Sequence, residues 1–459
     1  MPAKQSSSVS PARREAFAIL LELEKGSAHS DDLLRSPRVS ALSAQDRNLC
    51  TTLVMGVLRW QIRLDALIRT LLSKPNARLD LEIQIALRLG AFQLQHLDRI
   101  PVHAAISESV ALAKHAGHRF ASGMVNAVLR KIAAQPKPQP SLEGNLAPKE
   151  LAEATAHPIW LVERWATHYG IDAARTICEH GQQQPELAIR VNDPALETEL
   201  VAEGIRLEPG AILTAARRVI SGDITAIAAF HSGHLRIQEE GSQLIVELAR
   251  HGTNILDCCA APGGKTLILA ERNPQARITA CEISPARLKA LQARVATSPS
   301  SAQIEVQLAD AAQPPDNPTY DVILADVPCS GTGTLGRNPE IRHRLQPADL
   351  ARHHERQSAI LHGALRAGSG RVMYSTCSLE PEENSAVIAE VLREAHNWHQ
   401  IPVSEILDEL RAEGRLAPEI AQTLQNAIAA DGSLTILPGS LGPNVATDGF
   451  FIAVLEKRA

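Results

Sequence analysis

The stretch ILDCCAAPGGKT at residues 255–266 decides the fold, because a short apolar run passes there into a turn of Ala, Pro and Gly that opens a helix-forming segment. Two later stretches have the same form: ILADVPCSGTG at 323–333 and MYSTCS at 373–378. Short apolar runs closed by such turns are typical of parallel strands that are buried on both faces. The carboxyl ends of parallel strands point together at a crevice of the sheet. We therefore expect the three turns to meet in one site.

Strands and helices alternate regularly on both sides of these stretches, from residue 236 to the end of the sequence. Strands are predicted at 254–259, 277–282, 304–310, 320–326 and 371–377, with helices at 239–250, 265–272, 284–295, 348–366 and 381–393. A last strand is predicted to begin at Gly449. This order predicts a doubly wound α/β domain over residues 236–459 with right-handed crossovers. Residues 405–430 form a charged, Ala- and Leu-rich helical insert to which the sequence assigns no role.

The residues before this domain divide into three parts. Residues 12–134 have apolar positions at helical spacing and no hairpin signals, which predicts an all-α domain. Residues 135–148 contain four prolines without periodicity, as expected of a linker. Residues 149–235 alternate helices with single strands, which predicts a small α+β module. Arg190 and Asn192 end a predicted strand of this module, and they either contact RNA or are satisfied at the strand end.

Composition limits the class of protein and its partners. At 459 residues the chain predicts two or three domains. The net charge is −5, yet residues 1–140 carry 19 Lys and Arg against 11 Asp and Glu, so a local basic field leaves nucleic acid open as a partner. Seven cysteines without a CxxC pair or a His/Cys cluster favour a reducing cytosol and no metal site. With no signal peptide and no membrane-spanning run, we expect a soluble intracellular monomer.

The turn after the first strand predicts a nucleoside cofactor without a polyphosphate. A phosphate-binding P-loop needs glycine where Cys259 stands, and Pro262 removes one backbone N–H from the cradle. Glu282 ends the next strand, where an acid takes the hydroxyls of a ribose. Asp310 ends the third strand and could accept from an adenine amino group. S-adenosylmethionine fits this pattern better than NAD or ATP, whereas a pair of solvated carboxylates is the plainer alternative.

The cysteines fall into two groups. Four are expected to be inert core residues, since cysteine is among the most buried residue types: Cys50, Cys178, Cys258 and Cys281. Cys329 and Cys377 differ, because each follows a predicted strand in a polar loop, beside Ser330 or Ser378, at the face where a ligand must lie.

A thiolate beside a methyl donor has one well-motivated use. Carbon 5 of a pyrimidine is a poor nucleophile until a group adds at carbon 6, and a cysteine addition makes carbon 5 enamine-like. A carboxylic acid at N3 assists, and Asp326, three residues before Cys329, is suitably placed. With two cysteines, one attacks while the other helps to remove the proton on carbon 5. Spacing alone does not rank the two.

The motifs CAAPGGKT, DVPCSGTG followed by RNPEIR, STCSLEPEEN and DGFF together resemble those of the RNA cytosine-C5 methyltransferases. Near the N-terminus, LSAQDRNL, GVLRWQIRLDALI, LRLGAFQL, IPVHAAISESVALAK and ASGMVNAVLRKI resemble the NusB-like RNA-binding fold. Together they resemble the RsmB/Sun branch of the RsmB/NOP family, which methylates 16S ribosomal RNA. The resemblance covers nearly the whole chain and implies a Rossmann-like methyltransferase domain behind a NusB-like domain.

The resemblance also implies roles for individual residues. It implies that Cys377 is the nucleophile, that Cys329 serves product release and that Asp326 contacts both cytosine and cofactor. Contacts to S-adenosylmethionine are implied for Cys259, Ala260, Ala261, Pro262, Gly263, Gly264, Lys265, Glu282, Asp310 and Asp326. This chain has Glu282 where the family commonly has aspartate. Candidate phosphate ligands in the helical domain are Arg47, Arg59, Arg63, Lys114, Arg119, Arg130 and Lys131.

Three other functions remain to be weighed. A tRNA cytosine-C5 methyltransferase is the nearest alternative. A non-catalytic RNA-binding assembly or antitermination factor is a second, but it would have no use for Cys377, Cys329 and Asp326 together. A DNA methyltransferase is disfavoured, because no target-recognition insert is visible and those enzymes typically use the cysteine after the fourth strand. In each case the target base must be unpaired or flipped to expose its ring face.

Overall fold

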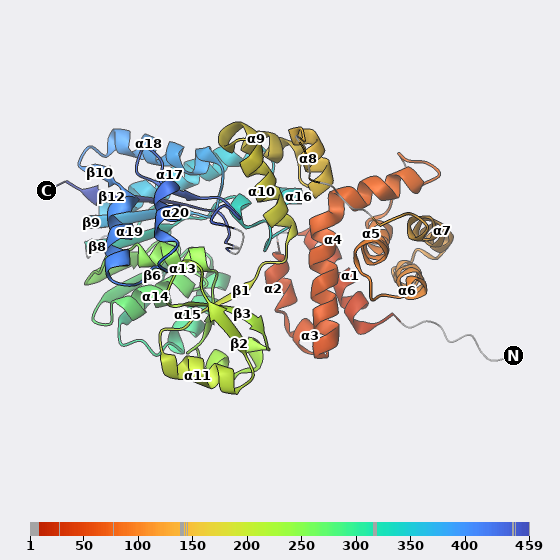
Figure 1. The fold of residues 1–459 in the computed structure, drawn as a ribbon, viewed down its shortest axis with the longest axis horizontal. Coiled ribbons are helices and arrows are strands. Elements are labelled where there is room, and N and C mark those ends of the chain that lie inside the picture. Colours follow the sequence, from red (N-terminus) through yellow and green to blue (C-terminus); the bar gives the residue numbers. More distant parts are fainter. Residues whose placement is uncertain are drawn as a thin grey trace. The chain divides into compact units, whose positions relative to one another are not determined.

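The computed structural model describes residues 9–26, 28–76, 78–137, 142, 144, 146–314, 319–442, 445 and 447–458. It divides into two compact units (Figure 1). The first comprises Met1–Gln183 and Leu335–Arg344, and the second comprises Gln184–Thr334 and Leu345–Ala459. Among the described residues, no helix combines the length and apolar character needed to cross a membrane.

The first unit is helical, as predicted from its apolar spacing. Its elements are α1 (Pro11–Lys25), α2 (Ser30–Leu34), α3 (Pro37–Ser40), α4 (Ala44–Leu71), α5 (Leu81–His96), α6 (Val102–His115), η1 (Arg119–Ala121), α7 (Ser122–Ala133), α8 (Pro148–Thr155), α9 (Ile159–Tyr169), α10 (Ile171–Gln182) and α16 (Ile341–Arg344). The long helix α4 begins at Ser43, whose Oγ accepts a hydrogen bond from the backbone N–H of Asp46 at 3.1 Å. This contact satisfies one of the free N–H groups at the helix start. A continuous core of side chains from α1, α4, α5, α6 and α7 then holds the bundle together.

The region predicted as one α+β module is divided between the two units. Its helices α8, α9 and α10 belong to the first unit, whereas its strands belong to the second. Arg63 on α4 donates from Nη1 to the backbone oxygen of Ala154 at 3.0 Å, which ties α8 to the helical bundle. The predicted linker 135–148 lies partly outside the described residues.

A segment from the second half of the sequence completes the helical unit. Residues 335–344 follow directly on the loop that carries Cys329, yet they pack among the helices. Glu340 is 2% exposed, and its carboxylate accepts from the N–H of Ser30 at 3.0 Å and from its hydroxyl at 2.9 Å. Arg344 donates to the backbone oxygens of Leu23 and Ala28. The segment is therefore a structural part of this unit.

Arg59 is committed to the same segment and is not a free phosphate ligand. Its guanidinium is buried and donates from Nη2 to the oxygen of Gly336 at 2.7 Å, and burial lowers its pKa to about 10. The backbone oxygen of Arg59 in turn accepts from Arg342 at 3.1 Å. The prediction that Arg59 binds phosphate is therefore wrong, because sequence spacing does not reveal which arginines a distant segment occupies.

The second unit contains two sheets and confirms the predicted α/β architecture. Its strands are β1 (Leu187–Arg190), β2 (Arg206–Pro209), β3 (Ala216–Ser221), β4 (Arg236–Ile237), β5 (Asn254–Asp257), β6 (Arg277–Glu282), β7 (Gln303–Leu308), β8 (Tyr320–Asp326), β9 (Gly368–Thr376), β10 (Trp398–Ile401), β11 (Leu434–Ile436) and β12 (Phe450–Lys457). The smaller sheet has the order β2-β3-β1-β4 and is antiparallel. The larger has the order β10-β12-β9-β8-β5-β6-β7, with β11 beside β12. Strands β5 to β9 are parallel, and β10 to β12 run antiparallel at one side.

Helices cover both faces of the larger sheet (Figure 1). Those of this unit are α11 (Pro194–Ala202), η2 (Ile224–Ala226), α12 (Ala228–His231), α13 (Glu240–Glu247), α14 (Gly264–Arg272), α15 (Pro285–Ala296), η3 (Thr332–Thr334), α17 (Asp349–Ala367), η4 (Pro381–Glu383), α18 (Ser385–Glu394), α19 (Val403–Ala412) and α20 (Ala421–Asn426). Side chains of α17 and α18 share one core cluster with the strands, and those of α13 and α14 share another. The 405–430 insert joins the second cluster through Ile406, Leu410 and Leu424. Its role is thus to close the core over β11 and β12.

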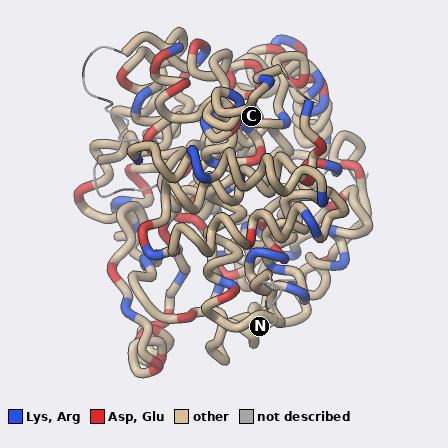
Figure 2. The backbone as a smooth tube through the Cα atoms, turned by 90° about the vertical axis from the view of Figure 1, so that its right-hand side faces the viewer, with Lys and Arg blue, Asp and Glu red and all other residues tan. Residues whose placement is uncertain are grey.

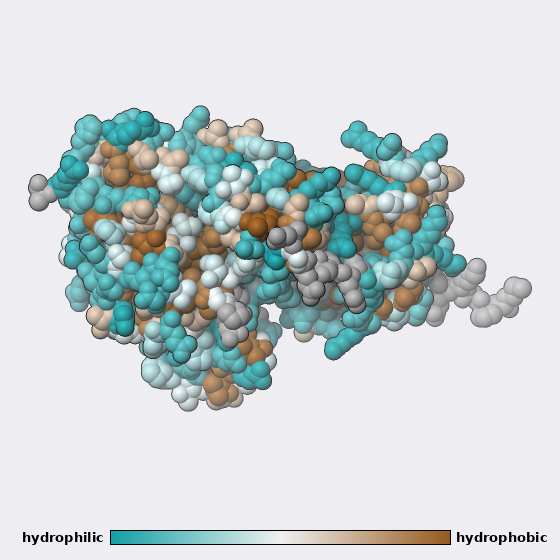
Figure 3. Space-filling model, turned by 45° about the horizontal axis from the view of Figure 1, so that its top comes forward, coloured by the Kyte–Doolittle hydropathy of each residue, from teal (hydrophilic) through white to brown (hydrophobic). Residues whose placement is uncertain are grey.

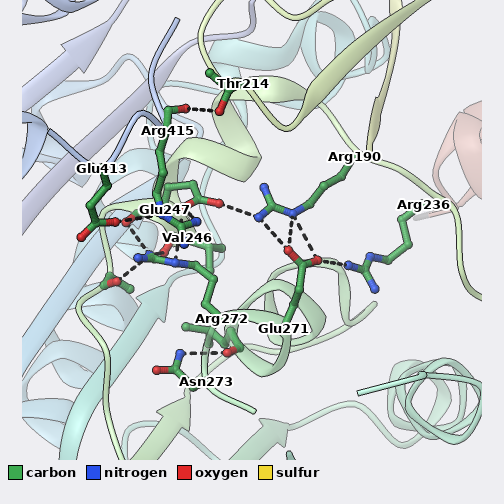
Figure 4. Close-up of polar contacts among 12 residues, drawn as sticks. Arg190, Thr214, Arg236, Val246, Glu247, Glu271, Arg272, Asn273, Glu413 and Arg415 are labelled. Carbon is green, nitrogen blue, oxygen red and sulfur yellow. Dashed lines mark hydrogen bonds and ion pairs between the residues drawn. The ribbon is translucent and has the colours of Figure 1, made fainter. Parts of the chain in front are cut away.

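Buried charges connect the smaller sheet to the helices of the larger one (Figure 4). Glu247 on α13 is 2% exposed and accepts from Arg190 on β1, with Nη2 and Oε1 2.6 Å apart. Its other oxygen lies 3.3 Å from Arg272 Nε and 3.0 Å from Arg415 Nη1. Glu271 on α14 binds Arg190 as well. The network fixes β1 against α13 and α14.

Apolar side chains are mostly interior in this fold. The face drawn in Figure 3 is largely hydrophilic, and apolar atoms reach it in small separate groups. A few large apolar side chains are nevertheless exposed, among them Phe120 in the helical unit, whose ring has no shielding neighbour.

Candidate active site

The two cysteines singled out in the sequence lie side by side. The Sγ atoms of Cys329 and Cys377 are 3.3 Å apart, and both residues are partly accessible. The pKa of the Cys329 thiol is raised, first by its hydrogen bond with Cys377 and then by burial. Cys329 therefore holds its proton more firmly than an ordinary thiol.

The pairing of two parallel strands causes this proximity. Strand β8 pairs with β9 so that Asp326 lies opposite Ser375, and both strands end at the same edge of the sheet. The loops then remain joined beyond the strands, because Gly333 donates its N–H to the oxygen of Cys377 at 2.9 Å. The expectation that the turns meet at one sheet edge is confirmed for these two.

Asp326 connects the cysteine loops to the glycine-rich turn. Its Oδ2 lies 2.7 Å from Nζ of Lys265, and its Oδ1 accepts from the hydroxyl of Ser375 at 2.8 Å. Burial opposes the charge on Lys265, but Asp326 outweighs it and raises the pKa of the ammonium. All three turns therefore contribute to a single polar centre, with Lys265 charged.

The glycine-rich turn borders a cavity of about 180 Å³. Its lining comprises Ile237, Gln238, Ser242, Asp257, Cys259, Ala260, Ala261, Pro262, Gly264, Lys265, Arg294 and Asp326. Gly263 has φ 104°, a left-handed conformation that favours glycine, and a Cβ there would approach Leu291 to 2.9 Å. The turn can thus bring its backbone close to a bound group at the start of α14.

The floor of this cavity contains a carboxyl group in an unusual state. Asp257 is 1% exposed, and burial raises its pKa to about 7, although the hydroxyl of Thr266 donates to it at 2.7 Å. The nearby charge of Asp326 adds to this rise. Asp257 is therefore poised to change its protonation near neutral pH.

Glu282 and Asp310 line a second small cavity of about 20 Å³ together with Arg287, Pro328 and Arg356. Glu282 is 3% exposed and accepts from the N–H of Ser284 at 2.8 Å, while Asp310 is exposed. Glu282 ends β6 opposite Leu308, the last residue of β7, so Asp310 lies two residues beyond the strand rather than at its end as predicted. Both carboxylates nevertheless line this cavity.

The remaining cysteines behave as core residues. Cys50, Cys178, Cys258 and Cys281 are buried, which confirms the prediction, and burial raises the pKa of each thiol. Burial also raises the pKa of the Cys259 thiol, so it contributes to the cavity wall as a neutral group. Within the described part of the chain, no group of His, Cys, Asp or Glu side chains could hold a metal ion.

The predicted phosphate ligands of the helical unit separate into two sets. Arg47 and Arg63 already donate to backbone oxygens within the unit. Lys114, Arg119, Arg130 and Lys131 are exposed, although Nζ of Lys131 also donates to the backbone oxygen of Leu71 at 3.4 Å. Figure 2 looks onto this unit and shows Lys and Arg on several of its helices. The exposed set around α6 and α7 therefore remains available to a polyanion.

The two strand-end residues of the smaller sheet have different outcomes. Arg190 is buried in the ion network, so it is satisfied at the strand end rather than free for RNA. Asn192 is exposed and lines a cavity of about 690 Å³ between α11, α12 and α14.

Sequence reasoning missed several residues that shape this centre. Ser375 orients Asp326, and Gln238 and Ser242 border the glycine-rich turn. Glu383 also escaped notice, although its buried carboxylate bonds to both cysteine loops. The only sequence signal was its position just after the second cysteine, in the run PEEN.

A parallel sheet of this order, a glycine-rich turn with two acidic strand ends, and paired cysteines define the class of the protein as a Rossmann-like methyltransferase. Residues 244–456 match the family described as 16S rRNA methyltransferase RsmB/F. Residues 10–134 match the NusB family, and 157–218 match the ferredoxin-like domain of RsmF/B-like methyltransferases.

Similarity to whole relatives extends these matches. The chain is 34% identical to the probable ribosomal RNA small subunit methyltransferase B of Bacillus subtilis, over 96% of this chain and 98% of that protein. It is 31% identical to the ribosomal RNA small subunit methyltransferase B of Pasteurella multocida, over 85% and 88% of the two chains. The chain therefore belongs to the RsmB/F family of 16S rRNA methyltransferases.

Solved structures confirm the fold. The crystal structure of PH0851 superposes with a TM-score of 0.78 at 23% identity and covers 99% of this chain and all of that one. NSun6 from Pyrococcus horikoshii, solved with SFG, gives a TM-score of 0.52 at 18% identity over 65% and 97% of the two chains.

Proposed function

We propose that this protein transfers a methyl group from S-adenosylmethionine to carbon 5 of a cytosine in 16S ribosomal RNA, through a covalent bond between Cys377 and carbon 6. The observation that carries the proposal is the 3.3 Å approach of Cys329 and Cys377 beside the Lys265–Asp326 pair. A structural cysteine pair has no need of an ammonium and a carboxylate at its side.

The cavity beside the glycine-rich turn suits S-adenosylmethionine. Glu282 retains acceptor capacity for the ribose hydroxyls, because a carboxylate has about four lone-pair sites. The N–H of Ser284 occupies one site on Oε1, and Arg287 Nη1 lies 3.4 Å from Oε2. Asp310 lies in the same small cavity for the adenine, and Asp326 and the neutral wall of Cys259–Pro262 border the remainder. When bound, the cofactor supplies an electrophilic methyl group to carbon 5.

The residues of the chain divide the remaining work. Cys377 adds as a thiolate to carbon 6, which forms an S–C bond and moves the electron pair of the double bond toward carbon 5. Asp326, which is a carboxylate paired with Lys265 in the free protein, takes up a proton from solvent and donates a hydrogen bond to N3, which stabilises this shift. After methyl transfer, the proton on carbon 5 leaves to a base, which we assign to Cys329. The returning electron pair then expels Cys377 as a thiolate. Cys329 acts here as a thiolate, after its own proton has passed to solvent, and its raised pKa makes that thiolate a stronger base than an ordinary one.

The helical unit is proposed to supply much of the RNA affinity. Its exposed Lys114, Arg119, Arg130 and Lys131 can neutralise phosphates, and the exposed ring of Phe120 offers a face on which a base can stack. The target cytosine must be unpaired or flipped, because attack at carbon 6 requires access to the ring face.

The covalent proposal is tested by replacing each cysteine. With cofactor and substrate RNA, Cys329→Ala should form the bond but release it slowly, leaving a protein–RNA band on a denaturing gel. Cys377→Ala should give neither a band nor methylation. The reverse pattern would exchange the two roles. No band with either variant, and methylation surviving in both, would end the covalent proposal.

The identity of the substrate requires a separate experiment. Bisulfite sequencing of ribosomal and transfer RNA from a deletion strain should show the loss of one 5-methylcytosine in 16S ribosomal RNA. Loss in a transfer RNA instead would support the tRNA methyltransferase alternative.

A further inference from the structure

The loops that carry the two cysteines are joined by one buried carboxylate. Glu383 in η4 is 0% exposed. Its Oε1 accepts from the N–H of Ser330 at 2.8 Å and from Nε2 of Gln357 at 2.9 Å. Its Oε2 accepts from the hydroxyls of Ser330 and Ser378. Four donors therefore occupy about all the lone pairs that a carboxylate offers.

These contacts act on the cysteines through their immediate neighbours. Ser330 follows Cys329, and Ser378 follows Cys377, so each thiol is one residue from a hydroxyl that Glu383 holds. The two hydroxyl oxygens lie 3.0 Å apart, close to the 3.3 Å between the sulfur atoms. The geometry of one pair thus constrains the other.

We propose that Glu383 is a positioning residue, which holds both cysteine loops in register so that the two thiols reach the same face of one base. Gln357 on α17 supports it, because the same Nε2 that donates to Glu383 also donates to the oxygen of Pro328 at 3.1 Å. This inference rests on the proposed function. It adds the requirement that a third residue, Glu383, hold the two cysteine loops together.

The charge of Glu383 has a second effect. It contributes to the raised pKa of Cys329, after the hydrogen bond with Cys377, burial and the charge of Cys377. Other ionisable groups nearby are the buried Tyr374, the Lys265–Asp326 pair, and His353, whose Nδ1 is 4.0 Å from Oε1 of Glu383. Glu383 therefore helps to keep Cys329 protonated while Cys377 attacks.

Glu383→Gln is the sharpest test, because it keeps the size of the side chain but replaces one acceptor oxygen by a donor. In the Cys329→Ala background, where the protein–RNA bond is trapped, Glu383→Gln should slow single-turnover formation of that bond roughly ten- to hundredfold, the scale expected of a misplaced reacting group. Cofactor affinity should stay within about twofold. Glu390→Gln on α18 is the matched control, since it removes a more exposed carboxylate paired with His354. In the same background, the control should form the bond at the rate of Cys329→Ala alone.

Thiol alkylation tests the inference without RNA. Iodoacetamide labelling of the full chain, mapped by peptide mass spectrometry across a pH series, should show the midpoint for Cys329 at lower pH in Glu383→Gln than in wild type. A general loosening would raise the rate of labelling without moving the midpoint. Ser330→Ala, which leaves the charge in place, should slow bond formation without lowering that midpoint, and it replaces Glu383→Gln if that variant does not fold.

Unchanged bond formation and an unchanged midpoint in Glu383→Gln would overturn the inference. The proposed function fails differently: Cys329→Ala protein with an intact Glu383 would form no bond to RNA, while the shift in Cys329 labelling between wild type and Glu383→Gln would persist.

Discussion

Removing Glu247 should destabilise the second unit far more than removing a carboxylate at the edge of the same network. Glu247→Ala leaves Arg190 and Arg272 buried without one of their partners, at side-chain exposures of 2% and 5%. An uncompensated buried charge typically costs about 3–5 kcal/mol.

The remaining contacts place the loss at the lower end of this range. Arg190 keeps Glu271, and Arg272 keeps the backbone oxygens of Val246 and Ala249. We therefore expect the free energy of unfolding to fall by about 3 kcal/mol, which corresponds to a lowering of Tm by roughly 6–12 °C for a domain of this size.

Glu413→Ala is the matched control. Glu413 binds Arg415 at 2.9 Å, but the two side chains are 47% and 35% exposed (Figure 4). A pair this open to solvent contributes roughly 0–1 kcal/mol, and added salt should weaken it further. Differential scanning calorimetry would measure both variants, with hydrogen exchange of α13 and α14 peptides assigning the transition to the second unit. Equal Tm shifts in the two variants would refute the reasoning.

Three further outcomes are expected. Glu282→Ala should weaken S-adenosylmethionine binding by roughly 1–3 kcal/mol in calorimetry, and unchanged affinity would mean that Glu282 is only a strand-end carboxylate. Asp257 has a folded pKa of about 7, above its unfolded value, so its contribution to stability is present at acid pH and is lost as pH rises toward 7. Asp257→Asn should therefore flatten the dependence of the free energy of unfolding on pH below 7, measured by denaturant titration. An unaltered pH dependence would count against the raised pKa. Phe120→Ala should weaken RNA binding by roughly 1–3 kcal/mol with an unchanged salt dependence. Arg119→Ala should instead reduce the slope of log affinity against log salt by about one. Variants that bind RNA like wild type would show that the RNA lies elsewhere.

Sequence reasoning succeeded where local pattern determines structure. The helices of the first unit and the parallel strands follow from apolar periodicity, and the meeting of Cys329 with Cys377 follows from strands that end at one edge. It did not predict β10 and β11, which are four and three residues long. The strands β1 and β5 are as short as β10, but they were recognised because their apolar runs continue beyond the strand, to Val191 and Cys258.

Long-range partners account for the other differences. Arg59 and Arg190 look like solvent-facing cations in the sequence, yet each is held by groups far along the chain. In the sequence, Glu383 is one acid of an acidic run, and only the fold shows that its buried carboxylate bonds to both cysteine loops. Periodicity identifies the faces of elements but not the partner that a given charge will find.

The segment 335–344 has a consequence for how the protein is made. Domains generally fold during synthesis from the N-terminus onward. Here the helices up to α10 are synthesised long before Glu340 and Arg342. The hydrogen bonds of Ser30 with Glu340, and of the Arg59 backbone oxygen with Arg342, can therefore form only after those later residues have been made. The first unit made is thus completed late, after the glycine-rich turn and Cys329 have emerged. A nascent chain that stops before residue 344 should carry an incomplete helical unit. The helical unit can therefore be completed only in chains in which synthesis has passed the glycine-rich turn and Cys329.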